Sequence, residues 1–289
     1  MTTIRLVYCN AEFFLLSLRY PQMIEVMEIA NVHLIYFSAT YTTRKVVRLI
    51  GKHMGRPVSE HDITRRGPKE PITFEANDLV ILGTPVYSGR IPVQAAKALQ
   101  QFQGTNTPAI IVCVYGNRDY DDALLELKET VEAQGFHVVS AGAFIARHSI
   151  FPDVAADRPD DNDVGIIGNF ADRSAGLLRR TPDVALLTGL EVKGNHPYRE
   201  IKPIPLQPHG NHRCDRCGVC VKQCPVQAIP EQSPRRTIKD KCISCGRCIV
   251  VCPQNARHFG GIKYKIGSKK FFKAYSGYKE PTVAFAHPV

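Results

Sequence analysis

The sequence predicts an α/β protein in which a doubly wound parallel sheet is followed by a smaller α+β domain rich in cysteine. Between residues 30 and 180, short apolar runs alternate with segments of helical length, and this alternation is typical of a parallel sheet with helices on both faces. Most of the cysteines lie instead between residues 214 and 252. The chain of 289 residues has room for about two domains, and its apolar content is ordinary for a soluble protein.

Four continuous apolar runs are expected to form buried strands. They are residues 32–37 (VHLIYF), 78–83 (DLVILG), 109–115 (AIIVCVY) and 136–146. Helices are expected after these strands at residues 44–54, 93–102, 121–134 and 160–180. Each expected strand is thus followed by a helix, which is the order found in parallel α/β sheets.

Polar loops follow the first three strands. Residues 38–43 (SATYTT) stand directly before a helix, where backbone N–H groups, the helix dipole and hydroxyl groups can converge on a phosphate, although Ser and Thr are also ordinary N-cap residues. Residues 84–92 and 116–120 follow the next two strands. Because ligands of such sheets bind beyond the carboxyl ends of the strands, we expect the three loops to gather there. Tyr87 and Tyr120 are candidates to flank a flat ring, or else ordinary rim residues.

The spacing of eight cysteines is the most specific signal in the chain. Two runs share the pattern C-x2-C-x2-C-x3-C-P and begin 28 residues apart. This is the spacing of bacterial iron–sulfur proteins that carry two clusters. The cysteines and prolines of the two runs are Cys214, Cys217, Cys220, Cys224, Pro225, Cys242, Cys245, Cys248, Cys252 and Pro253.

The spacing has a physical reason. Three closely spaced cysteines can wrap three iron corners of a cubane cluster, and Gly218 and Gly246 lie inside the two wraps, where the backbone must bend. The fourth cysteine is expected at the start of a short helix and ligates the other cluster, and the proline after it fixes φ. We therefore expect two [4Fe–4S] clusters. One is assigned to Cys214, Cys217, Cys220 and Cys252, and the other to Cys242, Cys245, Cys248 and Cys224.

Two other uses of clustered cysteine fit less well. A disulfide framework usually belongs to secreted chains, and a zinc site favours two pairs of cysteines rather than a run of four that ends in proline. Clusters built on thiolates need a reducing environment, so a cytoplasmic location with little oxygen is expected. Cys113 lies inside the third strand and is expected to be a core residue, and Cys9 has no assigned role.

Positive charge is concentrated at the end of the chain. Residues 211–289 contain 15 lysines and arginines against 4 acidic residues, a net charge of +11, whereas the remaining residues carry −1 of the total of +10. Two oxidised clusters with their thiolates carry roughly −4, so this region stays basic when loaded. The excess indicates an acidic redox partner or an anionic surface, or simply a solvated face that offsets the charge of the clusters.

Composition divides the chain into five segments. The extension at the start contains an apolar run (AEFFLLSL) too short for a membrane span, lacks the flanks of a signal peptide, and offers Met23 and Met27 as alternative starts. Residues 182–210, which lead into the cysteine-rich domain, contain five prolines. This proline density suits an extended linker, although a segment ordered against both domains is also consistent with it. The basic aromatic tail can stack on bases or anchor on the first domain, and we expect no nucleic-acid partner and no transmembrane segment. The segments are 1–30 (extension), 31–181 (sheet domain), 182–210 (linker), 211–258 (cysteine-rich domain) and 259–289 (tail).

Residues 30–180 resemble flavodoxins. Ser38–Thr43 matches the phosphate loop, with an alanine and a tyrosine in place of the usual glycines, and Thr84–Arg90 and Gly116–Tyr120 match the second and third flavin loops. The resemblance implies FMN, with a tyrosine beside the flavin ring and an asparagine at its edge, or else a flavodoxin fold that holds its flavin weakly or not at all. The candidate residues for FMN are Ser38, Ala39, Thr40, Tyr41, Thr42, Thr43, Thr84, Pro85, Val86, Tyr87, Gly89, Gly116, Asn117 and Tyr120.

The cysteine runs resemble bacterial two-cluster ferredoxins, and the resemblance implies one-electron transfer. Together the two halves are similar to the flavodoxin–ferredoxin fusion proteins of anaerobes over residues 30–257, on the stretches TTRKV and TPVYSGRIP. This similarity implies an electron-transfer protein in which two [4Fe–4S] clusters and FMN connect one-electron and two-electron carriers, with a redox protein as partner. Two alternatives stay open: an FMN-dependent reductase of a small acceptor, and a redox sensor whose first domain is a flavin-free docking domain.

A few further polar residues are considered for the site. Arg90 and Arg118 lie in the flavin loops and are candidates to stabilise an anionic reduced flavin. His148 and His209 lie near loops, where a lone histidine is more often structural. No residue stands out as a general acid or base, so no catalytic residue is assigned.

Overall fold

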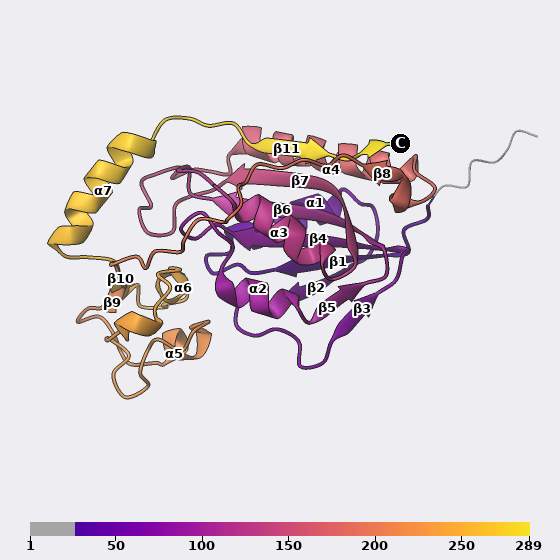
Figure 1. Ribbon diagram of the computed structural model, residues 1–289. Helices are drawn as coiled ribbons and strands as arrows, with labels where there is room; N and C mark the ends of the chain where they lie inside the picture. Colours follow the sequence, from indigo (N-terminus) through magenta and orange to yellow (C-terminus); the bar gives the residue numbers. More distant parts are fainter. Residues whose placement is uncertain (1–26) are drawn as a thin grey trace, which may run out of the picture.

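The structure is a computed structural model that describes residues 27–289. The expected extension, with Cys9 and Met23, lies almost entirely outside the described residues. The chain forms a central sheet covered by helices, and the cysteine-rich domain lies beside the sheet domain, with a long helix at its edge (Figure 1).

The main sheet has six strands in the order β11-β7-β6-β4-β1-β2. Five of them pair in parallel, and β11 pairs antiparallel with β7 at one edge. Taken in chain order, the parallel strands follow the arrangement 2-1-3-4-5, the flavodoxin order, whose switch point lies between the first and third strands. The predicted doubly wound parallel sheet is therefore confirmed. The strands are β1 (Asn31–Tyr36), β2 (Val58–Asp62), β4 (Asp78–Pro85), β6 (Thr107–Tyr115), β7 (Phe136–Ile145) and β11 (Thr282–Phe285).

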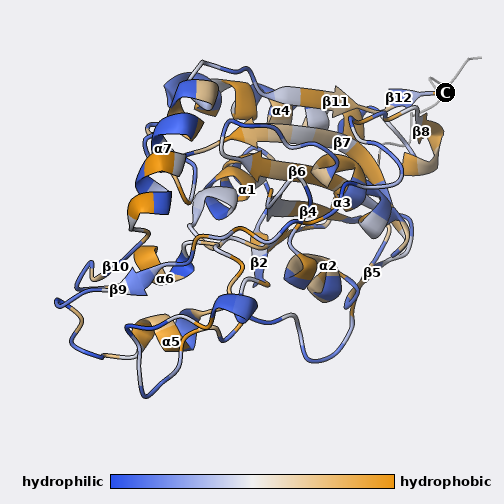
Figure 2. Ribbon diagram, turned by 60° about the vertical axis from the view of Figure 1, so that its left-hand side comes forward, coloured by the Kyte–Doolittle hydropathy of each residue, from blue (hydrophilic) through white to orange (hydrophobic). Residues whose placement is uncertain are grey.

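Helices cover both faces of the sheet because the strands carry apolar side chains on both faces. In β1, Leu34 packs on one face with α1 (Thr42–Lys52) and α4 (Asp161–Arg179). The next residue, Ile35, packs on the other face with α2 (Val93–Leu99) and α3 (Ala123–Glu132). Strands β6 and β7 are almost wholly buried, and hydrophobic colour dominates the centre of the molecule (Figure 2). Within residues 27–289, no helix combines the length and apolar character needed to cross a membrane.

Two strands of the sheet are absent from the sequence prediction. β2 is polar and largely exposed, so it has no apolar run to reveal it, and only its pairing with β1 identifies it. β11 belongs to the basic aromatic tail, where Phe285 packs against Phe170 of α4 with ring centroids 5.4 Å apart. The tail thus returns to the sheet domain after α7 (Ile262–Tyr275), and β12 (His287–Pro288) ends it.

The linker, residues 182–210, is ordered against both domains. It starts with a 3₁₀ turn, η1 (Val184–Leu186), and β8 (Leu187–Thr188), which pairs with β12. Further along, Asp122 accepts hydrogen bonds from the backbone N–H groups of Asn195 (2.9 Å) and Arg199 (2.8 Å). The linker therefore lies along the sheet domain instead of hanging free. The remaining short pair in this domain is β3 (Ile72–Phe74) with β5 (Phe102–Gly104).

The cysteine-rich domain repeats its backbone with the 28-residue spacing of its cysteines. Positive φ angles occur at the paired positions Gly218 and Gly246 (73° and 76°), where the sequence predicts sharp bends. The fourth cysteines, in contrast, follow the short helices α5 (Val219–Gln223) and α6 (Arg247–Val250) instead of starting them, because each helix already begins at the glycine of the wrap. The other elements are η2 (Lys239–Lys241), β9 (His209–Gly210) and β10 (Arg257–His258).

Candidate functional site

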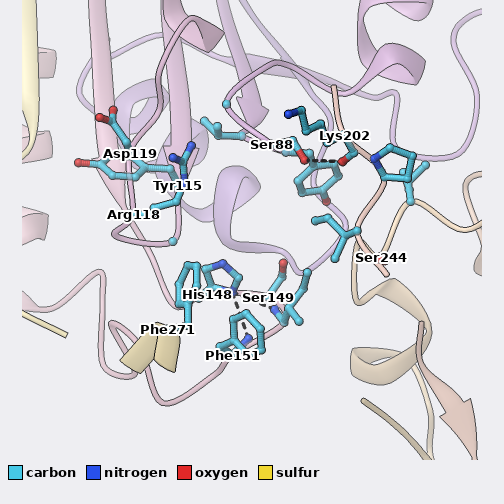
Figure 3. A pocket seen from close by; sticks show the side chains of 18 of the residues that line it. Ser88, Tyr115, Arg118, Asp119, His148, Ser149, Phe151, Lys202, Ser244 and Phe271 are labelled. Atoms are coloured by element: carbon cyan, nitrogen blue, oxygen red, sulfur yellow. Dashed lines mark hydrogen bonds between the residues drawn. The ribbon is translucent and has the colours of Figure 1, made fainter. Parts of the chain in front are cut away.

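A cavity of about 420 Å³ lies beyond the carboxyl ends of β4, β6 and β7. This is the edge at which doubly wound sheets bind their ligands, and the volume falls within the range of small-molecule pockets. Its walls come from the second and third flavin loops, from residues 148–151 after β7, from the linker, from the cysteine-rich domain and from Phe271 of α7 (Figure 3). The cavity is thus formed by sheet loops and closed by segments from later in the chain.

Only some of the residues predicted to bind FMN line this cavity. Val86, Tyr87, Gly89 and Gly116 do so. Thr84 and Pro85 stand one step earlier, at the end of β4, and the Thr84 hydroxyl is buried without a hydrogen-bond partner. The second and third loops are therefore brought together as predicted from their place after the strands.

Asn117 and Tyr120 of the third loop do not line the cavity. The Asn117 amide donates to the carbonyls of Tyr275 (2.6 Å) and Gly277 (2.8 Å), so it fastens the end of α7. Tyr120 is buried in the apolar core, 5.5 Å from the ring of Tyr115. The aromatic lining next to this loop comes instead from Tyr115, the last residue of β6.

The phosphate loop, residues 38–43, lies outside the cavity lining. The Ser38 hydroxyl accepts a hydrogen bond from the N–H of Arg44 (3.0 Å), and the Ser38 N–H donates to Thr64 (2.8 Å). Tyr41 is the N-cap of α1 with φ 66° and provides no side-chain cap. The hydroxyls of Thr40 and Thr42 lie 3.3 Å apart. Thr43 is buried beside Gly83, which places this loop next to the end of β4.

The two arginines of the flavin loops have different surroundings. Arg90 forms a two-point ion pair with Glu126 (2.6 and 2.7 Å) and donates to the carbonyl of Arg199 (2.9 Å). It therefore connects α3 to the linker and does not line the cavity. Arg118 does line the cavity, and its guanidinium pairs with Asp121.

The loop after β7 supplies cavity residues that the sequence analysis missed. The Nδ1 atom of His148 accepts hydrogen bonds from the N–H groups of Ile150 and Phe151, both at 3.1 Å. Burial, with a smaller effect of the nearby Arg118, lowers the pKa of His148 to about 4. The ring is therefore neutral at pH 7, and its hydrogen is on Nε2. The rule that ligand loops follow parallel strands would have identified this loop as well.

The eight thiols of the cysteine-rich domain form two groups. Burial raises the pKa of Cys220, and the other thiols that act on it are Cys214 and Cys252. Burial raises the pKa of Cys248 to about 11, and there the neighbouring thiols are Cys242 and Cys224. The fourth cysteine of each run thus lies with the first three of the other run. We call Cys214, Cys217, Cys220 and Cys252 the first thiol group, and Cys242, Cys245, Cys248 and Cys224 the second thiol group.

The backbone also turns N–H groups toward these thiols. Cys224 accepts a hydrogen bond from the N–H of Ala228, and Cys252 accepts one from Ala256, both at 3.3 Å. Hydrogen bonds to the ligating sulfur atoms are among the contacts that tune iron–sulfur clusters. Among residues 27–289, no three His, Cys, Asp or Glu side chains converge on a single ion; a cubane does not require this, since its thiolates bind different iron atoms.

A buried arginine lies between the two thiol groups. Arg257 is 2% exposed and donates to the carbonyl of Pro208 (2.8 Å) and to Thr237. After burial, its charge is the largest influence on the pKa values of Cys220 and Cys248, which belong to different groups. It therefore places one positive charge beside both sets of thiols.

The second thiol group borders the cavity, whereas the first includes an exposed thiol. Ile243 and Ser244, which stand between Cys242 and Cys245, line the cavity. Cys245 is 8% exposed and packs in the same apolar core as Tyr87, and the pKa of Tyr87 is raised by burial and by the charge of Cys245. In the first group, Cys217 is exposed. The loop that carries the second thiol group is therefore part of the cavity wall.

Residues 213–257 match the family of 4Fe-4S dicluster domains. This match covers the cysteine-rich domain and accounts for both cysteine runs. The C-terminal part of the chain is therefore a ferredoxin-type 4Fe-4S domain, which follows a sheet with flavodoxin strand order. A comparison with curated proteins finds no match for the chain.

Three solved structures similar to this chain are distant from it in sequence. The rubredoxin oxygen:oxidoreductase of Desulfovibrio gigas is 17% identical with a TM-score of 0.38, and 53% of this chain and 37% of that chain are covered. An NADH:FMN oxidoreductase in its apo form is 16% identical with a TM-score of 0.41, covering 53% and 91%. Flavodoxin 2 of Bacillus cereus is 16% identical with a TM-score of 0.38, covering 51% and 99%. The chain thus spans well under half of the first protein, and the fold assignment stands on the strand order.

The residues present fit an iron–sulfur and flavin electron-transfer role. The cysteine-rich domain offers eight thiols in two groups, with donors and a buried cation around them. The sheet edge offers a cavity lined by two of the three flavin loops. The Thr84 hydroxyl at the end of β4 is buried without a hydrogen-bond partner. The Arg247 Nε–H, next to the phosphate loop, is also buried without a partner. Unpartnered buried polar atoms of this kind indicate a place for a polar ligand.

Proposed function

We propose that the protein is an electron-transfer iron–sulfur flavoprotein. In this proposal each thiol group holds one [4Fe–4S] cluster, and the loops at the sheet edge hold FMN. Clusters of this kind exchange single electrons and flavins exchange one or two, so the combination connects one-electron and two-electron carriers. In this proposal the protein works in a reducing, cytoplasmic environment, because free thiolates must persist for the clusters to be assembled.

The observation that carries this proposal is the position of the second thiol group. Ile243 and Ser244 of its binding loop form part of the cavity wall opposite the flavin loops. The first thiol group lies farther out, with Cys217 exposed. In this proposal the cluster next to the exposed Cys217 exchanges electrons with an external carrier, and the other cluster connects it to the flavin at the sheet edge.

The chain's own residues would shape the environment of the flavin. Tyr115, His148 and Phe271 give the cavity aromatic walls that exclude water, and Arg118 adds a positive charge. The His148 ring is fixed by two backbone donors, so its Nε2–H is the available donor atom. Arg90 does not contribute, since its guanidinium is bound to Glu126.

Anaerobic purification followed by assays of iron, sulfide and flavin tests the proposal. We expect about eight iron atoms and one FMN per chain, counted from two cubanes and one flavin site. Replacing Cys245 with serine should remove iron from the second group, whereas Cys113→Ala, a buried cysteine outside both runs, should leave the iron content unchanged. A chain with full iron that takes up no added FMN would contradict the flavin part and favour a flavin-free docking domain.

An acidic redox protein is the proposed external partner. Cys217 is exposed together with Arg213 and Arg216 of the same loop, so the surface over the first thiol group is basic. Electron exchange with an acidic carrier should slow as salt is added, because screening weakens the attraction. A rate that does not change with ionic strength, measured by stopped-flow absorbance, would argue against this docking surface.

A second candidate function is an FMN-dependent reductase of a small acceptor. The observation that favours it is His148, a neutral ring held in one tautomer at the cavity. Such a group can donate a hydrogen bond from Nε2 to a carbonyl oxygen of a bound acceptor and hold the acceptor in place, while the proton itself comes from solvent. Steady turnover with a quinone that falls in a His148→Asn variant would support the reductase, whereas electron exchange with protein carriers alone would support the first proposal.

A further inference from the structure

Arg247 is buried where the cysteine-rich domain meets the phosphate loop. It is the first residue of α6 and only 7% exposed. Its Nη1 donates to the carbonyl of Ala39 (3.3 Å), and its Cζ lies 4.6 Å from the centre of the Tyr41 ring. A side chain from one domain thus reaches the anion-binding loop of the other.

The two residues it contacts are those that replace the usual glycines of a flavodoxin phosphate loop. Tyr41 keeps a φ of 66°, a conformation that glycine adopts more easily than any other residue. The cation–π contact with Arg247 helps to offset this strain. The tyrosine at position 41 thus makes a side-chain contact with the cysteine-rich domain that a glycine could not make.

The charge of Arg247 is not neutralised by these contacts. Its described partners are the Ala39 carbonyl, the Gln223 amide oxygen (2.9 Å) and the Tyr41 ring, none of which is charged. Its Nε–H is buried without a partner. A buried cation is costly unless an anion accompanies it. Arg247 also stands between Cys245 and Cys248 in the chain, so the second proposed cluster is the competing anion.

The loop beside Arg247 offers the other parts of an anion site. Tyr41 supplies no side-chain cap, and the N–H of Arg44 donates to the Ser38 hydroxyl (3.0 Å), which leaves the N–H groups of Thr42 and Thr43 in the first turn of α1 for an anion. The hydroxyls of Thr40 and Thr42 lie 3.3 Å apart in the same loop, and the Thr84 hydroxyl at the end of β4 has no partner. The loop lacks a basic residue of its own between Ser38 and Thr43.

We propose that Arg247 completes the phosphate site, so that the phosphate group of FMN is bound by both domains together. This inference rests on the proposed function. It makes flavin binding and domain contact mutually dependent, since a ligand that bridges two parts stabilises their association. The second thiol group is then held against the cavity whenever the flavin is in place.

The test compares FMN with riboflavin, which lacks the phosphate. Full-length protein with its clusters is dialysed anaerobically against each flavin, and the bound flavin is measured together with iron. Arg247→Gln should raise the dissociation constant for FMN by about tenfold or more, since a charge-assisted contact is lost, and leave that for riboflavin unchanged. Arg247→Lys should recover part of the FMN affinity.

Two further variants keep the test decisive. Arg235→Gln removes an exposed arginine of the same domain that donates to the carbonyls of His212 and Cys214, and it should change neither affinity. Tyr41 is far from the cysteines in the sequence, so Tyr41→Leu should leave the iron content unchanged. It should weaken FMN binding, because the contact between the Tyr41 ring and Arg247 is lost.

Three results with Arg247→Gln would overturn the inference. FMN affinity unchanged in Arg247→Gln would mean that the arginine serves another group, such as the second cluster. Tighter FMN binding would mean that it occupies the place of the phosphate. Equal loss of both flavins would indicate a structural role. A wild-type protein that binds both flavins equally removes only this inference, whereas one that binds neither removes the flavin proposal as well.

Discussion

At the scale of single residues, Arg257 shows how one buried charge serves two sites. It lies beside thiols of both groups and is held by Thr237 and the carbonyls of Pro208 and Pro234. Reduction adds negative charge to a cluster, so a nearby cation favours the reduced form. A single positive charge here therefore acts on both proposed clusters.

We expect Arg257→Gln to lower the reduction potentials of both clusters by tens of millivolts, where about 59 mV corresponds to a tenfold change for one electron. Anaerobic spectroelectrochemical titration measures this shift. Arg236→Gln, which removes an exposed arginine of the same domain, is the matched control. Unchanged potentials at full iron content would refute the assigned role.

His148 predicts a pH dependence of stability. Burial lowers its pKa from 6.5 to about 4 in the folded chain. As the pH falls below the unfolded value, the unfolded state takes up the proton first, so the free energy of unfolding decreases toward pH 4. Above pH 6.5 the ring is neutral in both states and makes no such contribution.

The His148→Asn variant should therefore lose less stability than the wild type between about pH 7.5 and about pH 5.5. Urea unfolding under anaerobic conditions at several pH values measures this difference. Parallel curves for the two proteins would show that His148 does not carry the pH dependence.

At the scale of elements, β11 closes the edge of the sheet with a strand from the tail. Phe285 is 9% exposed and packs on Phe170 and under the guanidinium of Arg173, whereas Val283 of the same strand is 38% exposed. The strand covers the backbone groups of β7, which would otherwise form an open edge.

Phe285→Ala should lower the free energy of unfolding by about 3 kcal/mol, because a buried aromatic ring is removed. Val283→Ala should cost less than about 1 kcal/mol. Equilibrium unfolding in urea compares the two variants. If both cost the same, the packing of β11 on α4 does not stabilise the sheet.

At the scale of the whole molecule, the linker holds the two domains in one arrangement. Both oxygens of Asp122, which is 3% exposed, accept hydrogen bonds from linker N–H groups. The hydroxyl of Ser88 donates to the carbonyl of Lys202 (3.2 Å), and the hydroxyl of Ser244 donates to that of Leu206 (2.5 Å). One segment thus ties the flavin loop and the cysteine-rich domain together.

Asp122→Ala should release the linker and make it sensitive to trypsin after Arg199, because two backbone N–H groups lose their acceptor. Glu132→Ala is the control, since Glu132 also belongs to α3 but pairs only with Lys128 on the surface. Limited proteolysis followed by mass spectrometry locates the cuts. Equal resistance in both variants would mean that other contacts suffice to hold the linker.

The sequence by itself determined those features that depend on local patterns. Buried strands are visible in the sequence as apolar runs. The iron ligands are visible as regularly spaced cysteines, because one loop must reach several corners of one cluster. The cavity position followed too, since carboxyl ends of parallel strands share one edge. The match over residues 213–257 confirms the 4Fe-4S domain, and the strand order confirms the sheet.

Only the tertiary structure decided which distant segments meet. Tyr120 and Asn117 have the right place in the sequence for a flavin loop, but packing turns one into the core and the other toward α7. The polar strand β2 has no apolar pattern, so pairing with β1 alone defines it. The contact of Arg247 with Tyr41 joins residues 206 positions apart, and no local pattern carries that information, since it arises from the docking of two separately patterned domains.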